Sequence, residues 1–221
     1  MLLPGPTKAS IKMWPLPTPG PRPHDPLATS DGALWYSGQM INALGRLDPK
    51  SGSFVEFPLK TPHSGLHGLV EDKEGNIWYT GNAGALIGKL DPKTGYTLPD
   101  AASRPRRMTI TSDDIVWYAD FSRGCLGRLD PATGKVSEWS SPSGPNSEPY
   151  GISAINDIIW YSESDTSPNT IVRFDPKTSA FQTWAIPGGG NIVRNTSVTR
   201  DGNFLLANSL VNGITLVTIE K

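Results

Sequence analysis

A Trp-Tyr dipeptide recurs along the chain at nearly constant spacing, and this repeat constrains the fold more than any other feature. The tryptophans are 43, 39 and 43 residues apart, and a Leu-Leu pair continues the series 45 residues later. The repeated positions are Trp35, Trp78, Trp117, Trp160 and Leu205. A period of about 40–45 residues is typical of a β-propeller blade, which is a radial sheet of four short strands. Five copies of the position therefore predict five blades.

A hairpin signature follows each of the four Trp-Tyr dipeptides. It reads Leu-Gly-Arg-Leu-Asp-Pro-x-Thr-Gly with small changes, and it covers residues 44–52, 87–95, 126–134 and 171–179. The aspartate caps the turn, the proline fixes φ, and the final glycine takes the left-handed conformation. An aromatic strand follows in residues 54–58, 136–140 and 181–185. We expect this strand to be the outer strand of its blade, with its aromatic side chain packed in the core.

The two ends of the chain fit this repeat together. The last unit supplies only three strands before Lys221, and an additional aromatic strand, Ile11–Pro17, precedes the first unit. We predict that this segment is the outer strand of the last blade and closes the ring, because closure removes exposed sheet edges. The predicted fold is an all-β, five-bladed propeller with four antiparallel strands per blade. It forms a single domain over residues 11–221, after a flexible segment over residues 1–10.

Composition narrows the choice of partners and compartment. A net charge of −1 gives no reason to expect nucleic acid or an anionic membrane as a partner. No apolar run reaches the roughly 18 residues of a membrane-spanning helix, and the single cysteine, Cys125, cannot form an internal disulfide. The first ten residues are too short and too proline-rich for a signal peptide. We expect a soluble monomer in the cytoplasm or the periplasm.

Three motifs resemble those of the streptogramin (virginiamycin B) lyase family. They are Asp-Gly-x-x-Trp-Tyr, the hairpin signature above, and Glu148-Pro-Tyr-Gly-Ile152, and the resemblance covers residues 11–221. The family has seven blades, so this chain would have lost two. The outer strand of the second unit is four residues shorter than its equivalents, just before Tyr96, and this is consistent with the loss of two blades at that point. The resemblance implies a lyase that opens cyclic streptogramin antibiotics by elimination. It also implies a Mg²⁺ ion and a general-base histidine at the channel mouth, with a glutamate close by.

The position of the family's histidine lies 11 residues before the blade tryptophan, or 10 in the fourth blade. The resemblance places that histidine in the last two blades, where this chain has Tyr150 and Arg194. Neither side chain is a good base near neutral pH. We therefore expect the elimination activity to be weak or lost. The catalytic residues stay unassigned, and so does the question of whether the chain is an enzyme.

The repeat also predicts two rings of side chains around the channel, because inner strands bring equivalent positions together. The first ring is His24, His67, Arg106, Tyr150 and Arg194, and the second includes Asp120, Glu163 and Asn208, three residues after the blade position. Side chains alternate in direction along a strand, so a neighbouring residue would point into the blade instead. Polar residues that differ at repeating positions indicate a ligand site. The alternative is that a water-filled channel simply tolerates polar groups.

The charges in these rings indicate the class of ligand. Two arginines favour an anionic or carbonyl-rich small molecule. Asp120 and Glu163 have the oxygen ligands that a hard cation such as Mg²⁺ takes, but we expect them instead to pair with Arg106 and Arg194. Two functions follow as hypotheses. The first is a lyase-like propeller with a polar ligand site at the channel mouth, and the alternative is a non-catalytic binding or scaffold propeller.

Overall fold

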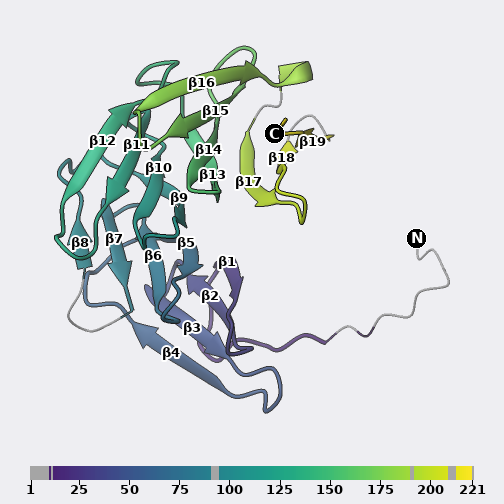
Figure 1. Cartoon of the computed structure of the whole chain (residues 1–221). Helices are drawn as coiled ribbons and strands as arrows, with labels where there is room; N and C mark the ends of the chain where they lie inside the picture. The colour runs from purple at the N-terminus through teal and green to yellow at the C-terminus, as the bar shows by residue number, and fades with distance from the viewer. Residues whose placement is uncertain (1–9, 11, 91–94, 190–191, 209–212, 221) are drawn as a thin grey trace.

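The computed structural model describes residues 10, 12–90, 95–189, 192–208 and 213–220. They form five antiparallel sheets arranged as propeller blades around a channel, with the first and fifth blades at the two ends of the arc (Figure 1). The all-β, five-bladed prediction is confirmed. None of the helices in the described part of the chain is long and apolar enough to cross a membrane.

Each of the first three blades is a meander of four strands, numbered outward from the channel. The first blade contains β1 (Pro23–Ala28), β2 (Leu34–Gly38), β3 (Ala43–Leu47) and β4 (Phe54–Pro58). The second contains β5 (Leu66–Glu71), β6 (Ile77–Gly81), β7 (Leu86–Lys89) and β8 (Gly95–Thr97). The third contains β9 (Pro105–Ile110), β10 (Val116–Asp120), β11 (Cys125–Leu129) and β12 (Val136–Ser140).

The fourth blade has four strands like the first three, and the fifth blade has three among the described residues. The fourth contains β13 (Pro149–Ile155), β14 (Ile158–Glu163), β15 (Thr170–Asp175) and β16 (Ala180–Ala185), followed by a short 3₁₀ turn, η1 (Pro187–Gly189). The fifth contains β17 (Val193–Val198), β18 (Phe204–Asn208) and β19 (Gly213–Val217). Within the described residues this last sheet therefore has three strands.

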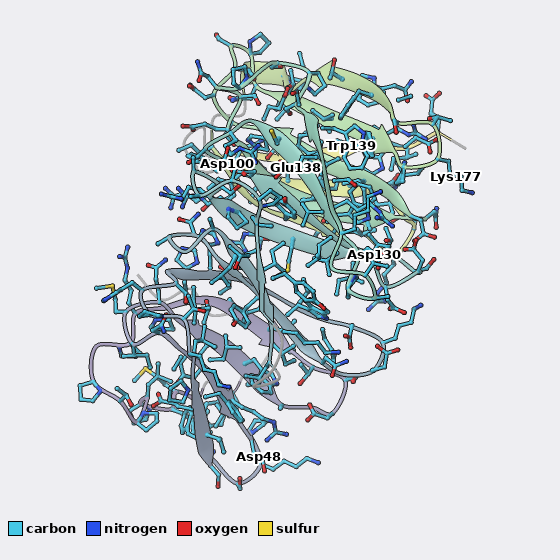
Figure 2. All side chains as sticks on the ribbon, turned by 90° about the vertical axis from the view of Figure 1, so that its left-hand side faces the viewer. Asp48, Asp100, Asp130, Glu138, Trp139 and Lys177 are labelled. Carbon is cyan, nitrogen blue, oxygen red and sulfur yellow. The ribbon has the colours of Figure 1, made fainter. Side chains whose placement is uncertain are left out.

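The hairpin signature forms the turn between the third and fourth strands, as predicted. The Asp48 carboxylate accepts a hydrogen bond from the Lys50 backbone N–H at 2.8 Å, and Asp130 accepts one from Ala132 at 3.0 Å. Asp48 and Asp130 lie beside these turns in Figure 2. The final glycine of the signature is left-handed, with φ of 78° at Gly52.

The repeated aromatic residues pack in pairs between the second and fourth strands of a blade. Trp35 stacks on Phe57 with ring centroids 5.5 Å apart, and Trp117 stacks on Trp139 at 5.6 Å. The same pairing joins Trp78 to Tyr96 and Trp160 to Trp184. This confirms that the aromatic repeat is a core repeat. The same aromatic pair therefore joins the second and fourth strands in each of the first four blades.

The predicted closure of the ring by Ile11–Pro17 is wrong for the residues that the structure describes. β19 pairs only with β18, and residues 12–22 form no strand. The physical reason is that the segment packs against the first blade instead. The Trp14 indole lies beside Gly52 of the β3–β4 hairpin, and the Thr18 hydroxyl donates to the Glu56 carboxylate.

These contacts match those of a normal outer strand with the blade that follows it. Tyr96, the outer aromatic of the second blade, lies beside Gly134 of the third blade in the same way that Trp14 lies beside Gly52. The N-terminal segment therefore takes the place of an outer strand in front of the first blade. The first nine residues of the expected flexible segment lie outside the described residues.

Candidate functional site

Four members of the first predicted ring lie together at the channel. They are His24 on β1, His67 on β5, Arg106 on β9 and Tyr150 on β13. The imidazole rings of His24 and His67 have centroids 4.0 Å apart, and His67 Nε2 lies 3.2 Å from the Tyr150 hydroxyl. The Arg106 guanidinium lies 5.4 Å from the Tyr150 ring centroid. The fifth member, Arg194, has an exposed side chain.

A break in strand pairing aims these side chains. In every blade, the pairing between the first and second strands shifts register at the ring position, and the shifts lie between residues 23 and 26, 66 and 69, 105 and 108, 149 and 152, and 193 and 195. Such bulges bend a strand and redirect its side chains. All five predicted ring positions fall inside these bulges, so the equal offsets in the sequence reflect one repeated backbone irregularity.

Hydroxyl groups hold three of the bulges in place. The backbone N–H of Gly68 donates to Thr80 Oγ1 at 2.8 Å, and the Thr80 hydroxyl donates in turn to the Arg106 carbonyl at 2.8 Å. Ser37 joins the Asp25 backbone N–H to the His67 carbonyl in the same way, and Ser162 joins Gly151 to the Val193 carbonyl. Sequence analysis missed these residues, although Ser or Thr two positions after three of the repeated tryptophans was a visible signal.

Asp25 and Arg107 also belong to the site, and sequence analysis missed both. The carboxylate of Asp25, which is 4% exposed, contacts Arg107 through Oδ2 and lies 2.8 Å from His24 Nδ1 through Oδ1. Arg107 Nε donates to the Arg194 carbonyl at 2.9 Å. Arg107 therefore links the first, third and fifth blades across the channel.

The environment of His67 keeps its imidazole neutral. Burial is the largest cause, and the positive charges of His24, Arg107 and Arg106 add to it, so that the pKa of His67 falls to about 2. The ring is 1% exposed, and its Nδ1 has no hydrogen-bond partner in the described part of the protein. The Arg106 backbone acts in the opposite direction and is the smallest of these causes.

Arg106 is held by aromatic rings rather than by a carboxylate. Its guanidinium lies 4.3 Å from the centroid of the Phe121 ring, a cation–π distance. Its buried Nε makes no hydrogen bond to any described residue. A buried guanidinium N–H without an acceptor is costly, so this atom is a place where a ligand oxygen would be stabilising.

A pocket of about 300 Å³ is lined in part by Phe121, the residue on which Arg106 stacks. Its lining residues are Phe121, Ser122, Pro145, Asn146, Glu148 and Asp165. Burial raises the pKa of Glu148, the charge of Asp165 raises it further, and Arg106 opposes both. Arg106 is not among the lining residues, but its guanidinium stacks on Phe121, which is one of them.

The second predicted ring does not neutralise the arginines of the first, and this expectation is wrong. Asp120 lies 3.5 Å from Arg123 and accepts from the Arg104 backbone N–H at 2.9 Å. The Asn208 amide donates to Thr215 Oγ1 at 2.6 Å. Arg123 also contacts Asp100 and Glu138, which lie close together in Figure 2.

Glu163 is likewise satisfied by polar groups near the end of its own strand. Its carboxylate accepts from the Ser141 hydroxyl at 2.7 Å, from the Ser143 hydroxyl at 2.6 Å, and from Thr170. These groups take the oxygens that we expected to face Arg106 or Arg194. Glu163 and Asp120 therefore stabilise the ends of the second strands, β14 and β10, and the loops beside them.

Comparison with known proteins places these features in a family. The model of the virginiamycin B lyase family matches residues 6–129. A comparison with curated proteins finds no match.

Solved structures are similar over most of the chain. A catalytically inactive His→Ala variant of virginiamycin B lyase from Staphylococcus aureus with quinupristin is 26% identical, with a TM-score of 0.83, over 92% of this chain and 69% of that one. A streptogramin B lyase structure is 26% identical, with a TM-score of 0.82, over 96% and 74%. A gluconolactonase from Xanthomonas campestris, 13% identical with a TM-score of 0.66 over 88% and 71%, shares the fold alone.

Proposed function

Because the chain belongs to the virginiamycin B lyase family, we propose that its channel mouth binds a small anionic or carbonyl-rich molecule, and that elimination of the family type is weak or absent. The single observation that carries the proposal is the buried Nε of Arg106 at the channel, which finds no acceptor among the residues that the structure describes. A carboxylate or carbonyl oxygen would supply that acceptor, and bonds between guanidinium and carboxylate are among the stronger hydrogen bonds in proteins.

The charge balance at the site supports an anion. Arg106 and Arg107 bring two positive charges, Asp25 brings one negative charge, and His67 stays neutral because its pKa is about 2. One positive charge therefore remains among these four groups, and Glu148 is the nearby carboxylate that interacts with Arg106. Tyr150, whose hydroxyl lies 3.2 Å from His67, adds a polar group close to Arg106.

The Mg²⁺ ion that the family implies does not fit these residues. His24, Asp25 and His67 do offer ligand atoms within 4.8 Å of one another. However, Mg²⁺ prefers oxygen ligands, and the one carboxylate here already contacts Arg107 and His24. The two guanidinium groups would also repel a divalent cation. We derive no catalytic step through a metal at this site.

The lack of histidine at the family's base positions supports the loss of elimination. Elimination needs a base whose pKa lies near the operating pH, and the pKa of His67 is far below neutral. Tyr150 and Arg194 hold the positions where the family resemblance places histidine. His24, whose Nδ1 lies 2.8 Å from the Asp25 carboxylate, is the one described histidine with the partner that orients a base.

We expect no enzyme-like opening of quinupristin by this protein. The measurement is mass spectrometry of quinupristin incubated with the protein, with and without Mg²⁺, beside a protein-free control. Linearised product at about 1 s⁻¹ or faster, in the range of ordinary enzymes, would contradict the loss of activity. A His24→Ala variant run in parallel would then identify whether His24 is the base.

Malonate is expected to stabilise the protein against heat, whereas its neutral analogue malonamide is not. At about 100 times the Kd, bound ligand adds roughly 2.7 kcal/mol, which corresponds to about 5–10 °C in Tm for a domain of this size. Arg106→Gln should abolish the malonate shift, and Arg128→Gln, on the third strand of the same blade, should retain it. Equal shifts with malonate and malonamide, or a full shift in Arg106→Gln, would favour the non-catalytic scaffold alternative.

A further inference from the structure

The outer edge of β19 has no partner strand within the described residues. In the other four blades the third strand pairs with a fourth on this side, as β15 does with β16. Two apolar side chains of β19 are left in solvent, with Ile214 71% exposed and Leu216 54% exposed. An unpaired strand edge with apolar side chains is a place where another strand adds.

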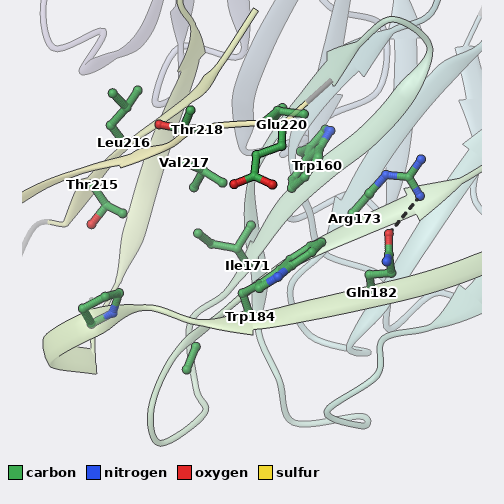
Figure 3. A pocket seen from close by; sticks show the side chains of 13 residues that line it. Trp160, Ile171, Arg173, Gln182, Trp184, Thr215, Leu216, Val217, Thr218 and Glu220 are labelled. Carbon is green, nitrogen blue, oxygen red and sulfur yellow. Dashed lines mark hydrogen bonds between the residues drawn. The ribbon is translucent and has the colours of Figure 1, made fainter.

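A pocket of about 580 Å³ lies between this edge and the fourth blade. Trp184 from β16 and Val217 from β19 line it from opposite sides (Figure 3). Trp184 is exposed, at 45%, whereas the outer aromatic residues of the first three blades are more deeply buried. The fourth blade therefore lacks a cover that the other blades have.

The third blade identifies that cover. Its outer aromatic, Trp139, packs at 5.0 Å against Phe174 on β15, the third strand of the next blade, and Phe181 packs on Phe174 at 4.7 Å. Phe181 lies on β16, which is the fourth strand of the next blade. In the fifth blade Val217 takes the position of Phe174. The part of the cover that Trp184 lacks is therefore a fourth strand, with an apolar residue three positions before its aromatic residue.

Residues 11–17 have the sequence of such a strand. Ile11 precedes Trp14 by three positions, as Phe181 precedes Trp184, and a proline follows Trp14, as Pro58 follows Phe57. Proline is tolerated in an edge strand. The segment is not used as a strand in its own chain, since residues 12–22 form none and Met13 is 87% exposed.

We propose that residues 11–17 of a second copy of this chain add to β19 as the fourth strand of the fifth blade, and that the exchange is reciprocal and forms a dimer. The sequence predicted a monomer and, separately, that this segment closes its own ring; the structure contradicts the closure. Reciprocal exchange of identical elements is a low-cost route to a symmetric dimer. It pairs two exposed apolar surfaces, that of Met13 and that of Trp184.

The register of the exchanged strand follows from the fourth blade. Trp184 pairs with Ile171, and Gln182 pairs with Arg173. The pairing of β18 with β19 makes Ile214 equivalent to Ile171 and Leu216 equivalent to Arg173. In the dimer, Trp14 therefore lies opposite Ile214, and Lys12 lies opposite Leu216.

The connection to the first blade has the sequence of an exchange hinge. Residues 17–21 read Pro-Thr-Pro-Gly-Pro, and Gly20 has a φ of 69°. Prolines keep this connection extended, because they fix φ and exclude helix. An extended connection lets the segment leave its own first blade and reach a partner.

The mass in solution tests the dimer. Light scattering of the full chain should give twice the mass of one chain, and a chain lacking residues 1–17 should give the mass of one. A chain lacking only residues 1–9 is the control and should remain a dimer. A full chain that stays monomeric at all concentrations up to the millimolar range would overturn the proposal.

Disulfide trapping tests the register and the partner together, and it does not depend on the ligand proposed above. In a Cys125→Ser background, Lys12→Cys with Leu216→Cys should form a covalently linked dimer under mild oxidation, because the two positions face each other. Lys12→Cys with Thr215→Cys is the control, one residue out of register, and should crosslink at least tenfold less. A crosslink within one chain, or no crosslink at all, would overturn the exchange.

Discussion

Replacing Arg107 with methionine is expected to lower the free energy of unfolding by about 3–5 kcal/mol, the usual cost of leaving one buried charge of an ion pair without its partner. Asp25 is 4% exposed, and Arg107 is the charged group on its Oδ2. The substitution also removes the hydrogen bond from Arg107 to the Arg194 carbonyl. Contacts between three blades are lost together, which is why the effect should be large.

Denaturant unfolding measures this cost, and a second arginine provides the control. Arg46 pairs with Asp31 at 2.8 Å, but the side chains are 34% and 55% exposed. Arg46→Met should therefore cost only about 0–1 kcal/mol. Combining Arg107→Met with Asp25→Asn should recover part of the loss, because the unpaired charge is gone. Equal stability of Arg107→Met and Arg46→Met would show that the link across the channel contributes little.

The second large effect is expected at the glycine of the third strands. A Cβ on Gly127 would lie 2.0 Å from the Tyr118 ring, and the equivalent atoms on Gly45 and Gly88 would lie 2.0 Å and 2.1 Å from Tyr36 and Tyr79. Tyr118 is fully buried, and its hydroxyl donates to Glu138 at 2.8 Å, so the ring has nowhere to move. Gly127→Ala should destabilise the protein by about 3 kcal/mol, at the upper end of ordinary overpacking.

A double-mutant cycle separates this clash from a general effect of the substitution. In a Tyr118→Leu background the ring is absent, so Gly127→Ala should cost about 1 kcal/mol or less, because pairs in direct contact are strongly coupled. Thermal or denaturant unfolding of the four proteins gives the coupling. If the alanine costs the same with and without the ring, the repeated glycine has another role.

The aromatic repeat made the blades predictable from the sequence, because each tryptophan needs a partner on the outer strand of its blade. It did not predict where Trp14 goes. An outer strand contacts both its own blade and the next one, and residues 12–18 satisfy the contacts with the next blade, at Gly52 and Glu56, without pairing with β19. The sequence repeat is compatible with contacts to the strand's own blade and with contacts to the next blade. It does not predict which of the two sets forms.

The candidate site was predictable in position but not in membership. Equal offsets from the repeated tryptophans located His24, His67 and Tyr150 at the channel. The period-two alternation of a strand then excluded their neighbours, yet Asp25 and Arg107 also meet at the channel. The reason is the bulge in each inner strand, which breaks the alternation at that point. The sequence signals the bulge only through the Ser or Thr residues that hold it in three blades.

Polar residues at the strand ends were misassigned for a related reason. Asp120 and Glu163 repeat in position, as channel residues do, but they differ in what surrounds them. Ser141 and Ser143 come from a loop before Glu163, and Arg123 follows Asp120 by three residues. The geometry of these loops decides the partners of Asp120 and Glu163, and the repeat pattern does not describe these loops.

A crystal structure of the protein with 4-bromobenzoate tests most directly whether the channel mouth binds anions. The bromine is located by its anomalous scattering, so the ligand can be placed without ambiguity. We expect the carboxylate within hydrogen-bond distance of the Arg106 guanidinium, with the bromine toward the pocket beside Phe121. Bromobenzoate found only elsewhere on the surface, with Arg106 uncontacted at a saturating concentration of the ligand, would contradict an anion site at the channel.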